Sequence, residues 1–401
     1  MEIVVIGGGA AGMAAAIEAA GHGAKVTLLE RMDRVGKKLL ATGNGRCNLM
    51  NVGEACYPGG STFAQSVLDK CGVAEQTVFW QELGLRLRVE DGGRVYPASG
   101  QASTVLDALR LAMDNLGVEI VTGASVKDIR PGKRGFTVTA DAGTWHGDRV
   151  ILAGGGCAQP KLGSDGSLWS IAERLGHTLV QPRPALTQIM TDTLPIKGLS
   201  GIRVKAEVAV VKAGRVLHEE SGEVLFADYG ISGVCVMQCA RFAEQGSVMR
   251  LNLLRGMGFE DASQAEAELL RRKAAWGSQP MEKLLTGLCV PRLAGSLCME
   301  AGIRFRDRHI GSLKDSEASA LAQVLGAFML PVKGVKGFDS AQVTAGGLDV
   351  REFDPATMAS RLVPGLYAAG EMLDVDGTCG GFNLMFAFGS GLLAARACVE
   401  E

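Results

Sequence analysis

The chain has 401 residues, of which 47% are hydrophobic and 21% charged, and its formal net charge at pH 7 is −2. This length suits two or three globular domains, and a charge so close to zero excludes a general attraction to nucleic acid or to an anionic membrane surface. Glycine accounts for 55 residues, about twice the usual share of roughly 7%, which predicts many tight turns and close approaches of the backbone to a ligand.

The start of the chain and its cysteines indicate a cytoplasmic protein. Glu2 and Glu18 interrupt the first apolar run, so it does not resemble a secretory signal. Nowhere do about 18 uncharged apolar residues follow one another, as a membrane span requires. The ten cysteines include no C-x-x-C pair. We therefore expect reduced thiols, no metal site and no membrane association.

The first thirty residues carry a dinucleotide-binding pattern. Residues 3–6 are a β-branched run typical of a buried parallel strand, and Gly7, Gly9 and Gly12 follow in G-x-G-x-x-G spacing before an alanine-rich helical stretch. A second apolar segment then ends at Glu30. This order predicts a Rossmann unit. The first glycine makes the turn, the second lets the backbone approach a pyrophosphate, the third lets helix and strand pack closely, and the acid binds a ribose hydroxyl.

A second fingerprint near the end of the chain selects FAD as the dinucleotide. Residues 362–373 read as a turn and an apolar strand followed by Gly370 and Glu371, whose carboxylate is expected to reach the ribityl hydroxyls. Residues 376–397 begin with glycines and continue as a helix of small residues. The free N–H groups at its start, from Gly381 to Leu384, are expected to face the flavin ring and stabilise negative charge on it. An NAD site would not need this second element.

Five segments resemble the YhiN-like (BaiN-like) flavoproteins, which are also described as NAD(P)/FAD-dependent oxidoreductases or aminoacetone oxidases. The two most specific are "RVGKKLLATGNGRCNLMN" at 34–51 and "GLYAAGEMLDVDGTCGGFNL" at 365–384. Looser matches lie at 176–189, 222–233 and 343–348. The resemblance covers nearly the whole chain. It implies an α/β fold, namely a split Rossmann-type FAD-binding domain of the glutathione-reductase superfamily with an inserted β domain and a small helical domain.

Hydrophobic patterning agrees with a chain divided in this way. Residues 203–212 alternate as a strand does, residues 261–299 have helical periodicity, and residues 301–311 alternate again. We therefore expect, in chain order, the first part of the FAD-binding domain at 1–185, the inserted β domain at 186–260, the helical insert at 261–312, the return of the insert at 313–335 and the second part of the FAD-binding domain at 336–401.

The glycine motifs and the resemblance together predict the residues that contact FAD. The resemblance implies the two lysines at 37 and 38, the loop that follows them, and Val126, whose backbone would meet the adenine. For the lysines an alternative is a solvated helix start, and for Arg46 a loop without a ligand. The complete predicted set is Gly7, Gly9, Ala11, Gly12, Glu30, Arg31, Lys37, Lys38, Arg46, Asn48, Val126, Gly154, Gly370, Glu371, Gly381, Asn383 and Leu384.

A proton donor is required if the flavin reduces a carbon–carbon double bond. Tyr229 and Asp228 are the candidates, because the resemblance places their loop toward the flavin. The same loop departs from the family, whose members commonly carry Thr-His before its glycine, so no particular substrate is carried over. His177 is expected to be structural, and Cys47 lacks the close partner cysteine that a disulfide reductase needs.

Three activities are compatible with such a flavoprotein. The first is reduction of an activated C=C bond in an enone-type small molecule, such as a steroid-like compound, by hydride transfer from flavin N5. NAD(P)H would be the electron donor and would dock transiently, because no second G-x-G-x-x-G motif follows a strand. The second is an amine oxidase of the aminoacetone type, with oxygen as acceptor.

The third activity, which the resemblance also implies, is reduction of uracil in ribosomal RNA. Arg304, Arg306 and Arg308 would line one face of a strand within 301–311 and could follow a phosphate backbone. Aromatic residues for base stacking are sparse in this region. We therefore favour a small-molecule substrate over RNA and leave the oligomeric state open.

Overall fold

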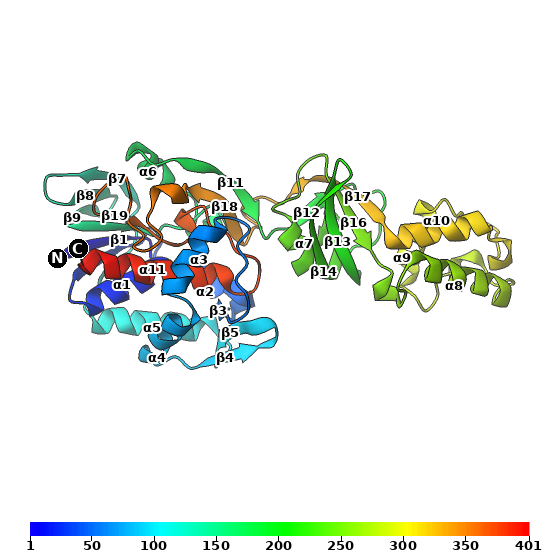
Figure 1. Ribbon diagram of the computed structural model, residues 1–401, viewed down its shortest axis with the longest axis horizontal. Helices are drawn as coiled ribbons and strands as arrows, with labels where there is room; N and C mark the ends of the chain where they lie inside the picture. Colours follow the sequence, from blue (N-terminus) through cyan, green and yellow to red (C-terminus); the bar gives the residue numbers. More distant parts are fainter. Residues whose placement is uncertain (401) are drawn as a thin grey trace. The chain divides into compact units, whose positions relative to one another are not determined.

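The computed structural model describes residues 1–400 and divides the chain into two compact units (Figure 1). Unit 1 consists of Met1–Pro184 together with the C-terminal segment that begins at Ala341, and unit 2 is Ala185–Ser340. Both ends of the chain therefore build the same unit.

The core of unit 1 is a five-stranded parallel sheet in the order β19-β10-β1-β2-β6. Apart from their first residues, β1 and β2 are buried throughout, as strands covered on both faces require. β19 comes from the C-terminal part of the chain and pairs with β10, so the predicted split Rossmann-type fold is confirmed. The strands are β1 (Glu2–Ile6), β2 (Lys25–Leu29), β6 (Glu119–Val121), β10 (Arg149–Leu152) and β19 (Leu366–Ala368).

Two helices form the centre of the helical layer in unit 1. α1 (Ala10–Gly21) follows the glycine turn and packs against α11 (Phe382–Glu400). The two backbones approach closely, because a Cβ on Gly391 would lie 2.3 Å from the carbonyl oxygen of Ala11. α11 is long and apolar enough to cross a membrane, but 72% of its apolar window is buried inside the protein. Its hydrophobicity is accounted for by its place in the core.

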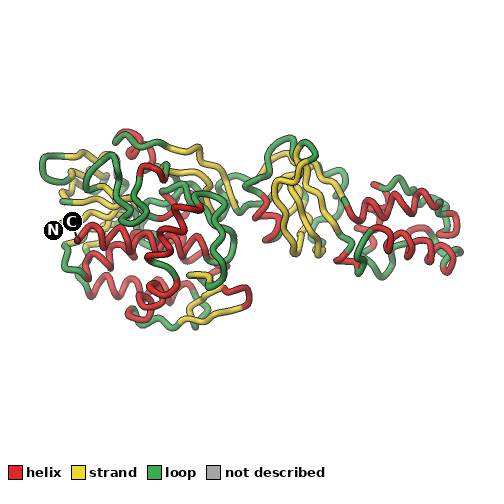
Figure 2. Tube along the Cα trace, in the orientation of Figure 1, coloured by secondary structure: helices red, strands yellow, loops and turns green. Residues whose placement is uncertain are grey.

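Smaller elements complete unit 1 (Figure 2). They are two antiparallel three-stranded sheets, a strand pair and five further helices. The first sheet is β3 (Met50–Asn51), β5 (Arg94–Pro97) and β4 (Leu87–Glu90), the second is β7 (Val126–Pro131), β8 (Phe136–Ala140) and β9 (Gly143–Gly147), and the pair is β11 (Leu179–Ala185) with β18 (Val343–Leu348). The helices are α2 (Lys37–Ala41), α3 (Ser61–Lys70), α4 (Val73–Glu82), α5 (Ala102–Asn115) and α6 (Trp169–Arg174).

Unit 2 contains a closed six-stranded barrel in the order β12-β15-β14-β13-β16-β17. The alternating segment at 203–212 forms β13, so that predicted strand is confirmed, and its Val208 and Val210 are fully buried. Helix α7 (Val234–Cys239) buries Cys235 and Cys239. The barrel strands are β12 (Ile189–Thr191), β13 (Arg203–Lys212), β14 (Arg215–Ala227), β15 (Gly230–Ser232), β16 (Val248–Asn252) and β17 (Phe328–Val335).

The helical segment of unit 2 lies between β16 and β17 in the chain. It comprises α8 (Ala262–Ala275), α9 (Pro291–Glu300) and α10 (Asp315–Gly326). α10 packs against α8, so the helical part continues to Gly326, beyond the expected end at 312. Of the expected return segment, 313–335, only β17 belongs to the barrel.

The strand expected within 301–311 is wrong. Gly302 (φ +78°) and Asp307 (φ +52°) adopt left-handed backbone conformations that an extended strand does not contain. Ile303 and Ile310 are buried and anchor the ends of a loop, and the segment ends in a short 3-10 turn at Ile310–Ser312. The alternation of arginine with other residues therefore reflects an exposed loop and does not give three arginines a common strand face.

Candidate cofactor-binding site

Of the three glycines in the G-x-G-x-x-G motif, the fold itself requires Gly7 and Gly12 but not Gly9. Gly7 has φ +109°, and a Cβ there would lie 2.4 Å from the carbonyl oxygen of Ala153. A Cβ on Gly12 would lie 1.8 Å from the carbonyl oxygen of Gly7. At Gly9, the N-cap of α1, a Cβ would meet no protein atom within 4 Å. The open space at Gly9 is compatible with the predicted approach of a pyrophosphate to the start of α1.

The carboxylate of Glu30 is oriented by the backbone around it. Glu30 follows β2 and is 8% exposed. Its Oε2 accepts a hydrogen bond from Gly8 N–H at 2.7 Å, and its Oε1 accepts one from Met32 N–H at 2.7 Å. Each carboxylate oxygen keeps a second acceptor direction, so the group can bind the hydroxyls of a ribose.

A narrow pocket brings together several predicted contacts from distant parts of unit 1. It contains Gly7, Glu30, Arg31, Val126 and Gly154 of the predicted set. Sequence reasoning missed the other seven residues of its lining. One of them, Gly163, with φ +112°, belongs to the turn-forming "GSDGS" stretch that could have indicated a shaped loop. The lining is Ile6, Gly7, Leu29, Glu30, Arg31, Ala124, Ser125, Val126, Gly154, Gly163, Ser167 and Leu168.

The two predicted lysines have different partners. Lys38 Nζ lies 2.6 Å from Oε2 of Glu371, so residues from the two ends of the chain form an ion pair. Lys37 pairs with the exposed Asp33, four residues earlier in the chain, at 2.5 Å. Of the two, Lys38 is the one directed at the predicted ribityl-binding acid.

The start of α11 has the features expected of a flavin-binding helix end. Gly381 has φ +112°, and a Cβ there would lie 2.4 Å from the carbonyl oxygen of Met50 and 2.9 Å from Oδ1 of Asn48. That Oδ1 is buried and has no hydrogen-bond partner within the protein. The N–H groups of the first helical turn lack intrahelical partners by geometry, and Asn383 shapes the turn by bonding to both N and O of Gly377. A buried free acceptor beside free donors fits the polar edge of a flavin.

Arg46 is occupied by protein partners. Its Nη2 lies 2.6 Å from Oε1 of Glu90, and its guanidinium stacks 4.1 Å from the centre of the Tyr96 ring. The hydrogen bond from Arg46 lowers the pKa of Glu90. In this arrangement Arg46 ties the predicted loop to the β4–β5 hairpin.

The candidate proton donors lie in unit 2, in the turn between β14 and β15. Asp228 is exposed and Tyr229 is half-buried. The carbonyl oxygen of Tyr229 accepts a hydrogen bond from Thr191 N–H, and Lys336 Nζ lies 4.3 Å from the centre of the Tyr229 ring. The backbone of Tyr229 is therefore fixed by a hydrogen bond, and the Lys336 ammonium lies over the face of its ring.

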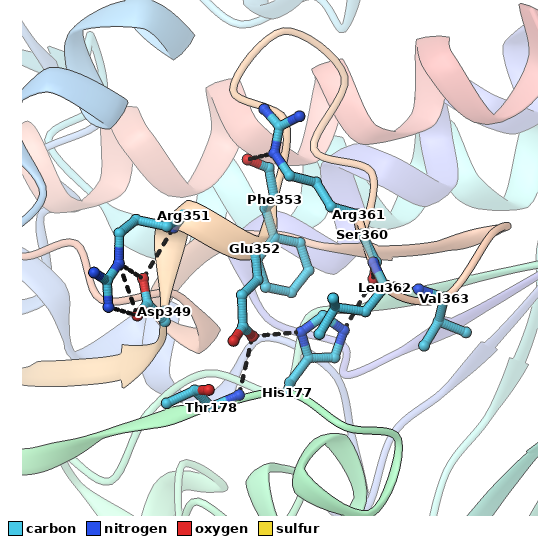
Figure 3. Close-up of polar contacts among 10 residues, drawn as sticks. All are labelled: His177, Thr178, Asp349, Arg351, Glu352, Phe353, Ser360, Arg361, Leu362 and Val363. Carbon is cyan, nitrogen blue, oxygen red and sulfur yellow. Dashed lines mark hydrogen bonds and ion pairs between the residues drawn. The ribbon is translucent and has the colours of Figure 1, made fainter.

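His177 has the surroundings of a structural residue, as predicted (Figure 3). Its Nδ1 lies 3.0 Å from Oε2 of Glu352 and its Nε2 lies 3.0 Å from Oγ of Ser360. A serine, a histidine and an acid in this order resemble a hydrolytic triad. However, Ser360 Oγ also accepts N–H bonds from Leu362 and Val363, and the His177 side chain is fully buried. Both lone pairs of the hydroxyl are engaged, so the cluster joins the residues just before β11 to the segment after β18.

Cys47 and Cys56 do not have the character of a redox-active thiol pair. Burial raises the pKa of Cys47 to about 12, which keeps it a neutral thiol, and Cys56 is exposed while Cys47 is buried. Within residues 1–400, no group of three or more His, Cys, Asp or Glu side chains is arranged to hold a metal ion.

Comparison with known proteins gives a family match and several full-length relatives. The model of the HI0933-like protein Rossmann domain matches residues 1–397. The 3-dehydro-bile acid delta(4,6)-reductase of Clostridium scindens is 39% identical, covering 100% of this chain and 99% of its own length. The ribosomal RNA dihydrouridine synthase of Haemophilus influenzae is 28% identical, with the same coverage of 100% and 99%. Among solved structures, a 3-ketosteroid-delta4-(5alpha)-dehydrogenase from Rhodococcus jostii aligns with 18% identity and a TM-score of 0.47, covering 100% of this chain and 97% of the other.

Proposed function

The chain belongs to the family of HI0933-like Rossmann-domain proteins, and on this premise we propose that it is an FAD-dependent reductase of an activated carbon–carbon double bond in a steroid-like enone. The resemblance to YhiN-like flavoproteins is thereby confirmed. The single observation that carries the proposal is the end-to-end similarity to a named bile acid reductase. The substrate class is a conjugated ketone, because conjugation with a carbonyl makes the distant carbon of the double bond electron-poor and open to hydride.

FAD, when bound, supplies the hydride chemistry. The chain supplies its binding groups. The start of α1 at Gly9 would hold the pyrophosphate, Glu30 a ribose and Glu371 the ribityl chain, since each presents the donors or acceptors that those groups need. Asn48 and the first turn of α11 would hold the polar edge of the flavin ring.

Reduction of a C=C bond adds one hydride and one proton, so the protein must also deliver a proton. We assign this role to the Tyr229 hydroxyl, with Asp228 as the alternative in the same turn. The hydroxyl would protonate the carbon next to the ketone while the other alkene carbon receives the hydride. Lys336 above the ring would stabilise the negative charge left on the phenol oxygen. The half-buried phenol can then recover a proton from solvent.

NAD(P)H is the proposed electron donor and the cytoplasm the proposed compartment. Among the described residues, the one parallel sheet of Rossmann type is that of unit 1, and unit 2 is a barrel with helices. NAD(P)H would therefore dock transiently at the flavin without a Rossmann unit of its own.

Anaerobic mixing experiments test this function. The FAD-loaded protein is mixed with NADH or NADPH and the flavin absorbance is followed, then a 3-oxo-4-ene or 3-oxo-4,6-diene steroid is added. We expect bleaching by one nucleotide and recovery of the absorbance on addition of the enone, with the saturated ketone as product. Failure of every conjugated ketone to restore the absorbance would overturn the proposal, and peroxide release from small amines in air would favour the oxidase.

A second candidate, uracil reduction in ribosomal RNA, is supported by the full-length relative of that name. The loop at 301–311 exposes Arg304 and Arg306, whereas Arg308 is bound to Glu317 at 2.8 Å. If RNA is the substrate, binding should weaken steeply with salt, and R304A/R306A should reduce it. If the parent protein binds no RNA measurably and this variant turns over the enone at the parent rate, RNA is excluded as the substrate and the small-molecule function is supported.

A further inference from the structure

The segment "VTAGGL" at 343–348 forms the fully buried strand β18 and has no role in the function described so far. Its glycines let neighbouring backbone approach very closely. A Cβ on Gly346 would lie 2.6 Å from the carbonyl oxygen of Gln181, and one on Gly347 would lie 2.8 Å from the backbone of Leu373. Because β18 is enclosed in this way, any polar group that it presents is held in one position.

Thr344 of β18 makes three hydrogen bonds to two other segments. Its N–H donates to Oε1 of Glu371 at 2.7 Å. Its Oγ1 accepts from the N–H groups of Cys157 at 2.8 Å and Ala158 at 3.1 Å. Thr344 and Ala158 are both fully buried, so these N–H groups would lack a partner if the hydroxyl were removed.

The other oxygen of Glu371 is bound to Lys38, whose Nζ lies 2.6 Å from Oε2. The carboxylate is about one-fifth exposed and Lys38 about a quarter. Each carboxylate oxygen thus has one protein donor and one acceptor direction left. An ion-paired carboxylate accepts hydrogen bonds and donates none, which is what the hydroxyls of a polyol chain require.

The loop after β10 lies directly against this pair. A Cβ on Gly156 would lie 2.4 Å from Oγ1 of Thr344 and 3.0 Å from Oε1 of Glu371. Glycine at this position is what allows the loop to reach both groups. Four segments, from α2, the 156–158 loop, β18 and the turn after β19, therefore meet at one carboxylate.

We infer that Lys38 and Thr344 are positioning residues for the flavin nucleotide. Lys38 orients the Glu371 carboxylate, and Thr344 holds the 156–158 loop beside that carboxylate through its hydroxyl. This inference rests on the proposed function in requiring that FAD binds. It differs from a direct contact between Lys38 and FAD, because Lys38 acts through Glu371.

A double-mutant cycle separates these two roles of Lys38. The dissociation constant of FAD is measured by fluorescence titration of apo-protein for the parent, K38M, E371Q and K38M/E371Q, with K25M as control, since Lys25 pairs with Glu2 at the exposed surface. We expect K38M and E371Q each to weaken binding about 10-fold, corresponding to about 1.4 kcal/mol, and the double variant to bind like E371Q. Losses that multiply in the double variant would overturn positioning through Glu371.

Thr344 is tested by a conservative pair of variants. T344V removes the Oγ1 acceptor and keeps the N–H, T344S keeps both, and T77V removes a hydroxyl bonded to Val73 in α4 of the same unit. We expect T344V to bind FAD about 10-fold more weakly and to change the visible circular dichroism of the bound flavin. T344S should restore both properties, and T77V should retain the parent values.

The outcomes distinguish this inference from the proposed function. A folded T344V with parent-like affinity and flavin dichroism would overturn the role of Thr344. Should T344V fail to fold, G156A provides the same test from the loop side, because its Cβ would collide with Oγ1, and parent-like FAD binding by G156A would count against the inference. If the parent protein itself does not bind FAD, the proposed function is overturned, and the inference that rests on it is overturned with it.

Discussion

Glu352 accepts a hydrogen bond from the buried imidazole of His177, with Oε2 3.0 Å from Nδ1. Because an ionised carboxylate can only accept, Nδ1 must carry the proton in this bond. Burial opposes ionisation of Glu352, but hydrogen bonds from Thr178 N–H and from His177 outweigh it and lower the pKa of the carboxyl below its usual 4.5.

This pair predicts a pH dependence of stability. A carboxyl whose pKa is lower in the folded state stabilises the protein fully above its unfolded pKa, near 4.5, and the stabilisation is lost as the pH falls through the lower folded value. We expect E352Q to lower the free energy of unfolding at neutral pH by about 1–3 kcal/mol. The gap between the parent and E352Q should shrink as the pH falls below about 4.5.

Urea denaturation of both proteins across that pH range measures the gap, with E2Q, at the exposed Lys25 pair, as a control that should stay close to the parent throughout. If the difference in unfolding free energy is as large in acid as at neutral pH, the ionised Glu352 carboxylate is not the source of the stabilisation.

A second prediction concerns Gly9, which the protein fold does not require. G9A adds a Cβ that meets no protein atom, and φ −85° is accessible to alanine, so the apo-protein should melt like the parent. FAD binding should nevertheless weaken by about 10-fold or more, because the Cβ would obstruct the approach of the pyrophosphate. G21A, in open space at the other end of α1, is the matched control and should bind FAD normally. Equal affinities for G9A and G21A would argue against a pyrophosphate at this turn.

A third prediction separates folding from binding at the same motif. The Cβ of G12A would lie 1.8 Å from the carbonyl oxygen of Gly7, a backbone atom that cannot move aside cheaply. We expect a loss of about 3 kcal/mol in the free energy of unfolding of the apo-protein, measured by urea denaturation. G9A in the same experiment should show almost no loss. A G12A protein as stable as G9A would mean that α1 can shift relative to β1.

A fourth prediction concerns the proton donor. Y229F keeps the aromatic ring beneath Lys336 but lacks the acidic proton, so flavin reduction by NAD(P)H should continue at the parent rate. Reoxidation of the flavin by an enone should slow by about 10²-fold or more, the typical contribution of a general acid. D228N serves as the comparison from the same turn. Parent-like reoxidation by Y229F together with slow reoxidation by D228N would transfer the role to Asp228, and parent-like rates for both would remove this turn from the mechanism.

The Rossmann motif shows how much could be predicted from the sequence. Strand β1, the glycine turn, α1 and Glu30 lie within thirty residues, and each depends on short-range stereochemistry: the φ of Gly7, the space at Gly12 and the free N–H groups of a helix start. The residues of one short segment determine these features, so a sequence motif can identify them.

The segment at 301–311 shows where patterning fails. Its alternation matched a strand, but Gly302 and Asp307 turn the chain and Arg308 is bound by Glu317 from the following helix. A period of two gives a strand only where a neighbouring strand is available to pair with it, and the adjoining segments here are helices.

The sequence by itself determined that this protein has a split dinucleotide-binding domain, because its glycines and acids act over a few residues. Only the tertiary structure decided that Lys38 meets Glu371, 333 positions away, that Thr344 and Gly156 close around the same carboxylate, and that Arg46 is bound to Glu90. These pairings depend on the order of the strands and on the close packing of backbones at glycine. Neither is a property of any short stretch of sequence, so the partners of a charged side chain become known only when the chain is folded.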